Sequence, residues 1–170
     1  FTTLQLLFIN LINDSLPAIA LAFEVAEPNT MNKPPRDINE GILQGGTSSV
    51  ILIRGIIISI VVIIAQYLGN KTSPILGAAM AFSTITLSRI FQTLPARSDN
   101  ISVFNIGVAK NKYVLGAIGI CLLLYLIVLL PGLRAIFSIP NYFGVMEFAI
   151  CILLALISTV LMELVKIFKK

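Results

Sequence analysis

Three oxygen-bearing side chains lie close together in the apolar stretch FINLINDSLP, residues 8–17. On an α-helix, Asn10, Asn13 and Asp14 are spaced i, i+3 and i+4 and therefore share one face. A carboxylate beside neutral amide oxygens is the ligand chemistry of hard cations such as Ca²⁺. An ionisable residue within a membrane helix marks an ion pathway by default. We therefore predict a cation-binding site that includes Asn10, Asn13 and Asp14.

Pro17 predicts a break in the helix at this site. In an α-helix residue 17 would donate its N–H to the carbonyl of Asn13, but proline has no N–H and its ring displaces that carbonyl. Irregular backbone at membrane depth is tolerated only where it is buried in protein or lines a cavity. The break favours a functional site over the alternative, in which the amides join helices and the acid is paired structurally. One helix cannot complete such a site, so other helices must supply ligands.

The composition is that of an integral membrane protein. The 170 residues are 57% hydrophobic and 12% charged, with a mean hydropathy of +0.97, whereas soluble domains are about a quarter charged. The absence of histidine excludes His-based metal sites and catalytic bases. The formal net charge of +4 lies mostly in loops and indicates membrane orientation rather than a nucleic-acid partner. Cys121 and Cys151 lie apart in apolar segments and are interpreted as packing residues.

Five apolar segments approach the length of about 20 residues that spans a bilayer. The predicted fold is therefore all-α, a single integral membrane domain over residues 1–170 that forms a helical bundle of five transmembrane helices in the lipid bilayer. The predicted spans are residues 3–23, 50–68, 74–94, 113–130 and 145–167. The longest connection, residues 24–49, is polar.

The basic residues predict which ends of the spans face the cytoplasm. Eight lysines and arginines lie in the long connection, the third connection and the C-terminal tail, whereas the other two connections hold only Lys71 and Arg134. The positive-inside rule then places residues 24–49 and the C-terminus in the cytoplasm and residue 1 outside. Because residue 1 would lie outside without a visible signal peptide or an initiating methionine, we expect further membrane helices upstream.

The stretch FINLINDSLPAIALAFEVAEPNTMNKPPR, residues 8–36, resembles the sixth membrane helix and following cytoplasmic loop of P-type cation-transporting ATPases of the calcium-pump group. The shared pattern is approximately N-L-x-x-D-x-L-P-A-x-A-L, then M-x-x-P-P-R. RSDNISVFNIGVAKNKYVLGAI resembles the loop between the eighth and ninth helices of that family, and LMELVK resembles the end of the tenth. The resemblance covers essentially the whole chain and implies that the five spans are helices six to ten, the C-terminal transmembrane region.

The resemblance implies roles for the residues of the first span. Asn10 matches an asparagine and Asp14 an aspartate that bind the transported cation, so these two are the implied metal ligands. Asn13 stands where two-ion pumps usually have a threonine. This departure weakens the assignment of a second ion site.

Arg89 stands where two-ion calcium pumps of this family have a glutamate, nine residues before Ser98. A guanidinium is always charged and cannot bind a cation, but it can fill that site with fixed positive charge and pair with Asp14. The prediction is therefore one transported ion per cycle. The alternative is that Arg89, roughly 8 Å from the end of its span, extends its side chain to the membrane interface.

The long connection has an implied coupling role. Pro34, Pro35 and Arg36 match the family loop that touches the cytoplasmic phosphorylation domain and links phosphorylation to closure of the ion site. The implied partners are this domain and the upstream membrane helices of the same polypeptide. Mg²⁺ and ATP would act there, because these 170 residues hold no DKTGT phosphorylation motif and no nucleotide-binding loop.

The hypothesis is the membrane part of a P-type ATPase that exports Ca²⁺ through the plasma membrane, with one ion per ATP. The chain would then be part of an enzyme only within the intact pump. One alternative is a non-enzymatic membrane carrier or subunit that moves ions or protons. Another is a pump for a different cation, such as Na⁺, K⁺, H⁺ or Mn²⁺.

Overall fold

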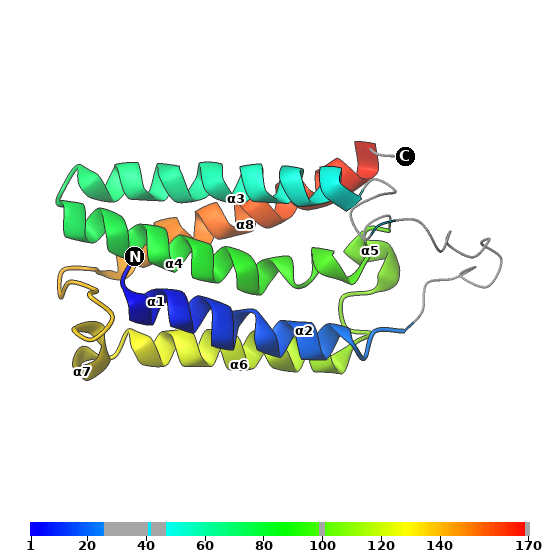
Figure 1. The fold of residues 1–170 in the computed structure, drawn as a ribbon, viewed down its shortest axis with the longest axis horizontal. Helices are drawn as coiled ribbons and strands as arrows, with labels where there is room; N and C mark the ends of the chain where they lie inside the picture. Colours follow the sequence, from blue (N-terminus) through cyan, green and yellow to red (C-terminus); the bar gives the residue numbers. More distant parts are fainter. Residues whose placement is uncertain (26–40, 42–46, 99–100, 169–170) are drawn as a thin grey trace.

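Every regular element of the described residues is a helix (Figure 1). The structure is a computed structural model, and it describes residues 1–25, 41, 47–98 and 101–168. The N-terminus and the end of the last helix lie at opposite ends of the bundle (Figure 1). The all-α fold predicted from the sequence is confirmed for this part of the chain.

The first span is divided into α1 (Thr3–Leu7), the π-helical turn η1 (Phe8–Asn13) and α2 (Ser15–Leu21). The other long helices are α3 (Thr47–Asn70), α4 (Pro74–Gln92), α6 (Lys112–Val128) and α8 (Val145–Phe168). Short elements connect them, namely η3 (Pro95–Arg97), α5 (Val103–Ile106) and α7 (Pro131–Arg134).

Four helical segments are long and apolar enough to cross a membrane. They are Thr3–Leu21, Ser48–Asn70, Pro74–Gln92 and Val145–Lys166, which correspond to four of the five predicted spans. The predicted span 113–130 is a shorter apolar helix, Lys112–Val128, because Pro131 disfavours helical backbone in the residue before it. The last residues of the predicted loop 24–49 are helical and belong to α3.

The most apolar helices lie on the outside of the bundle. The spans of α3 and α8 have a mean hydropathy of 2.6 but are only 11% and 22% buried. α4 has a mean hydropathy of 1.4 and is 67% buried, between α3, α8, α6 and η1. Polar side chains within a bilayer are stable where they face the bundle interior. α4 carries four of the buried polar residues that the structure describes, namely Ser83, Thr84, Thr86 and Ser88, whereas the spans of α3 and α8 are mostly exposed and apolar.

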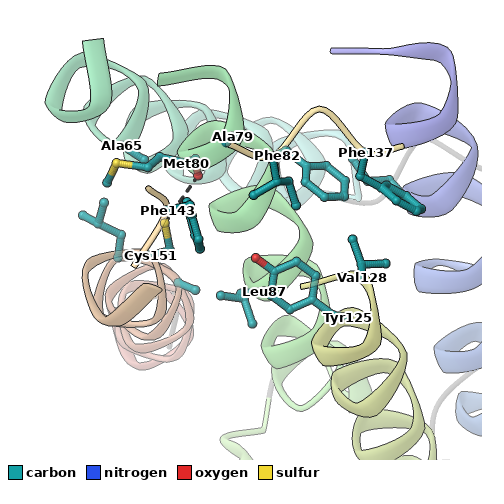
Figure 2. Close-up of a cluster of buried hydrophobic side chains, with 14 of the residues drawn as sticks. Ala65, Ala79, Met80, Phe82, Leu87, Tyr125, Val128, Phe137, Phe143 and Cys151 are labelled. Atoms are coloured by element: carbon teal, nitrogen blue, oxygen red, sulfur yellow. Dashed lines mark hydrogen bonds between the residues drawn. The ribbon is translucent and has the colours of Figure 1, made fainter. Parts of the chain in front are cut away.

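An aromatic cluster fixes the first span against α4 (Figure 2). The Phe82 ring of α4 lies 6.2 Å from Phe8 and 6.1 Å from Phe137, and Phe8 meets Phe137 edge to face at 5.6 Å. Tyr125 of α6 packs against the same Phe82 ring at 6.3 Å. Such ring pairs contribute about 0.5–1.5 kcal/mol each beyond their buried area. The cluster sets the position of η1, which begins at Phe8.

Glycines allow the backbones of α3 and α4 to approach closely at their tight turn. A Cβ atom built on Gly69 would lie 2.6 Å from the Cα of Gly77. Ser73 caps α4 by accepting a hydrogen bond from the N–H of Leu76 at 3.1 Å, and Pro74 occupies the first turn, where a missing N–H leaves no bond unmade. The close approach of the two helices therefore requires small residues at positions 69 and 77.

We expect Gly69→Ala to destabilise the protein by about 2 kcal/mol, because the added methyl group must displace backbone. Thermal unfolding of the purified, detergent-solubilised protein measures the effect. Gly55→Ala is the matched control, since it lies on the same helix and its Cβ would meet nothing within 4 Å. Equal unfolding temperatures for the two variants would contradict the close approach.

Candidate cation site

A wide helical turn holds Asp14 in place. The Asp14 N–H donates to the carbonyl of Ile9 at 3.1 Å, an i→i−5 bond, whereas the Ala18 N–H donates to the carbonyl of Asp14 at 3.2 Å in the α-helical pattern. The irregularity therefore lies in residues 8–14, and Pro17 sits in the first turn of α2, where backbone N–H groups lack helical partners. The prediction that the break falls at Pro17 is thus corrected to a π-helical turn that precedes it.

The π-helical turn changes which residues share a face. The Asn13 side chain is buried, with 1% exposure, and its Nδ2 donates to the carbonyl of Thr86 on α4 at 3.0 Å. Asn10 is exposed. The prediction that both amides lie with Asp14 on one face assumed α-helical spacing, which this segment does not have. Asn13 Oδ1 is buried and has no hydrogen-bond partner among the described residues.

Arg89 and Asp14 form an ion pair between α4 and the first span. Arg89 Nη1 donates to Asp14 Oδ1 at 2.8 Å and to Oδ2 at 2.7 Å, and the two side chains are 39% and 38% exposed. The guanidinium thus lies at the carboxylate, which distinguishes this arrangement from the alternative in which Arg89 reaches the interface. The pair also explains how both charges are accommodated inside a membrane span.

Buried hydroxyl groups surround this pair on α4. Thr86 and Ser88 are buried, and their hydroxyl oxygens have no hydrogen-bond partner within the described ranges. The Thr93 hydroxyl donates to the carbonyl of Arg89 at 3.3 Å, and Gln92 Nε2 donates to Ser158 Oγ of α8 at 3.4 Å. Sequence analysis did not identify Ser88 or Ser158, although the moderate hydropathy of α4 is a signal that this helix is the buried one.

Two polar clusters anchor the C-terminal end of the bundle. Arg97 donates to both carboxylate oxygens of Glu24, at 2.9 and 2.8 Å, and to the carbonyl of Gly107 at 2.9 Å. Asn111 Nδ2 also donates to Glu24, at 2.7 Å. The Arg97 guanidinium holds the pKa of the Glu24 carboxyl below its usual 4.5, and Asn111 acts in the same direction although burial opposes them. This cluster fixes the end of the span that carries Asp14.

The second cluster joins α8 to the connection that follows α4. The Glu163 carboxylate accepts hydrogen bonds from the hydroxyl of Ser102 at 2.7 Å and the N–H of Val103 at 3.1 Å. Lys166 donates to Glu163 at 2.9 Å and to the carbonyl of Pro95 at 2.7 Å. Neither cluster was predicted from the sequence, because only Glu163 and Lys166 are neighbours in the chain and their other partners are 60 or more residues away.

The described residues supply only part of a cation site. They contain no group of three or more His, Cys, Asp or Glu residues that could hold a metal ion. Ca²⁺ takes six to eight oxygen ligands, more than the Asp14 carboxylate and the side-chain oxygens of Asn10 and Asn13 can supply. A cation at this position would therefore find one carboxylate and a fixed counter-charge here, and would need further ligands from outside these residues.

Comparison with known proteins identifies the family of this chain. Residues 1–168 match the family described as "Cation transporting ATPase, C-terminus". The chain belongs to this family and is the membrane part of a P-type cation ATPase, as the resemblance in the sequence implied.

Its relatives include calcium-transporting ATPases. The chain is 54% identical over 167 residues to one from Listeria monocytogenes and 53% identical over 169 residues to one from Lactococcus lactis. These alignments cover 98% and 99% of this chain and 19% of each relative. A calcium-transporting ATPase of Bacillus subtilis is 32% identical over 138 residues, which is 79% of this chain and 15% of the relative. The chain thus spans about a fifth of the length of the first two relatives.

The Glu24 cluster predicts a pH-dependent contribution to stability. A carboxyl whose pKa is lowered by folding stabilises the protein above its ordinary pKa, and this contribution is lost as the pH falls through the lowered value. We expect Glu24→Gln to destabilise the protein by roughly 2 kcal/mol at pH 7, because a charge-assisted hydrogen-bond partner is lost. The difference from wild type should disappear well below pH 4.5.

Thermal unfolding in detergent between pH 7 and pH 3 measures this difference. Glu147→Gln is the control, because the Glu147 carboxylate accepts a hydrogen bond from its neighbour Gly144 at 2.8 Å and makes no ion pair within the described ranges. A Glu24→Gln effect of constant size at every pH would contradict the assignment.

Proposed function

We propose that this chain carries the cation path of a pump that exports Ca²⁺ through the plasma membrane, with one ion per ATP. The relatives named calcium-transporting ATPases support the choice of ion. Family membership favours a pump over a non-enzymatic carrier or subunit. In this proposal the C-terminus and the long connection face the cytoplasm, in agreement with the distribution of basic residues.

The observation that carries the proposed stoichiometry is the contact of Arg89 with both oxygens of Asp14. A permanent positive charge at 2.7–2.8 Å from the carboxylate repels a cation on its own side of the site and leaves room for one ion on the other side. Arg89 therefore replaces a second ion rather than binding one. When Ca²⁺ binds, Asp14 shares its negative charge between the ion and the guanidinium.

Asn10 and Asp14 are the proposed ligands within this chain. Asn10 is exposed and Asp14 is partly exposed, so both are accessible from the outer face of the first span. Leu7 and Leu11 of the same span are also exposed, and upstream membrane helices of the same polypeptide would pack against them. Those helices would supply the other oxygen ligands. Asn13 is a candidate through its unpartnered Oδ1, held in place by the bond to Thr86.

ATP hydrolysis would take place in domains outside this chain. ATP and Mg²⁺ would bind there, and the phosphorylation domain would act on the ion site through the long connection. Pro34, Pro35 and Arg36, the proposed coupling residues, lie outside the described residues. The coupling role therefore rests on the resemblance of this segment to the family.

We expect Asp14→Asn to lower the apparent Ca²⁺ affinity of the full-length protein by more than about 100-fold, because loss of residues that merely support a metal ligand already costs 10–100-fold. Asn10→Ala should cost at least about tenfold on the same basis. Ca²⁺-dependent phosphorylation by ATP across a panel of cations measures both. Glu147→Gln is the control carboxylate, and a full Ca²⁺ response in Asp14→Asn would remove the proposed ligand.

We expect Arg89→Glu to raise the number of Ca²⁺ ions bound per phosphorylated protein above one, because a carboxylate replaces the fixed positive charge. Radioactive Ca²⁺ binding, normalised to phosphorylation, gives the ratio. Arg89→Lys is the matched control: it retains the charge without the planar fork of donors, so the ratio should remain one. Unchanged ratio and affinity in Arg89→Glu would exclude the proposed role.

A further inference from the structure

A cavity of about 780 Å³ opens at the C-terminal end of the bundle, away from Asp14. It lies where α2 ends and α6 begins, beside the connection that contains α5. Its apolar walls include Phe23, Ile101, Ile106 and Tyr113, and its polar lining includes Lys110 and Lys112. This volume is within the range of pockets that bind small molecules, about 300–1,000 Å³.

The position of the cavity matches the boundary between hydrocarbon and water. The first span ends at Leu21 and the apolar helix α6 begins at Lys112, so two membrane helices end beside it. The Phe23 and Tyr113 rings lie 4.7 Å apart and are 58% and 63% exposed. Aromatic rings concentrate at this depth of a membrane, next to the headgroups.

The lining of the cavity carries an excess of positive charge. Its single acid, Glu24, is paired with Arg97 and accepts a hydrogen bond from Asn111. Lys110 and Lys112 are exposed, and neither forms an ion pair with a residue that the structure describes. Two ammonium groups without a carboxylate partner lie beside apolar walls. This combination suits a ligand that has an anionic group joined to a hydrocarbon chain.

We propose that this cavity binds the headgroup of an anionic phospholipid. The phosphate would lie between Lys110 and Lys112, and the glycerol and first acyl carbons would contact Phe23, Tyr113 and Ile106. Basic residues near a membrane surface attract anionic lipids. The apolar walls would also bury the apolar part of a lipid, which a free phosphate ion lacks. The lipid would contact α2 and α6 together, at the end of the span that holds Asp14. The inference does not depend on which cation the protein carries.

The test uses the full-length protein in nanodiscs of equal parts phosphatidylglycerol and phosphatidylcholine. Native mass spectrometry after release from the nanodisc measures the ratio of the two lipids retained. We expect Lys110→Gln/Lys112→Gln to lower the retained phosphatidylglycerol at least about fivefold, the contribution of one basic residue near the surface. Lys110→Arg/Lys112→Arg should retain the lipid, and Lys71→Gln, at the opposite end of the bundle, is the control for general charge.

A second variant distinguishes lipid binding in the cavity from attraction by surface charge alone. Ile106→Trp keeps both lysines but fills the cavity, so it should lose phosphatidylglycerol to a similar extent. Retention that is unchanged in the double glutamine variant or in Ile106→Trp would overturn the proposal. Displacement of the lipid by millimolar inorganic phosphate would overturn it as well, because the site would then recognise the anion without its lipid. Equal loss in Lys71→Gln would exclude a specific site.

Discussion

The ion pair between Asp14 and Arg89 is the contact on which the interior of this bundle depends. A single carboxylate at membrane depth is costly, and a guanidinium beside it offsets the cost only if the two helices stay in register. Two contacts hold the first span in register with α4. Phe8 packs on Phe82 on the N-terminal side of Asp14, and the hydrogen bond from Asn13 to Thr86 lies directly beside Asp14 in the sequence. The partial exposure of the pair leaves the carboxylate open to a further ligand on the outer face.

The long helices differ in hydropathy and in burial. The outer helices α3 and α8 have the highest mean hydropathy of the four candidate spans and are only 11% and 22% buried. α4 is less apolar and mostly buried, and it carries Arg89 and several buried hydroxyl groups. Close approach of Gly69 to Gly77 joins α3 to α4 at one end, and the bond between Gln92 and Ser158 joins α4 to α8.

Hydropathy and charge were sufficient to predict the helices, and one motif was sufficient to predict the family. The resemblance to the family also indicated the partner of Arg89, because the arginine stands where two-ion pumps have a glutamate and can fill that site while pairing with Asp14. The π-helical turn could not be predicted, since Pro17 indicates a disturbed hydrogen-bond pattern but not on which side the helix absorbs it. The Glu24–Arg97 contact was equally inaccessible, because 73 residues separate its members and only the packed bundle brings them together. The role of Pro34 lies outside the described residues.

The wide turn at residues 8–13 stores one residue more than an α-helical turn of the same height. If its i→i−5 bonds were exchanged for i→i−4 bonds, the backbone after the turn would rotate by about 100°, the angle of one helical residue. Asp14 would then swing around the helix axis while Phe8 stayed packed against Phe82. Such an exchange would turn α2 as a whole about its axis, and the hydrogen bonds between Glu24 and Arg97 just beyond that helix oppose this rotation.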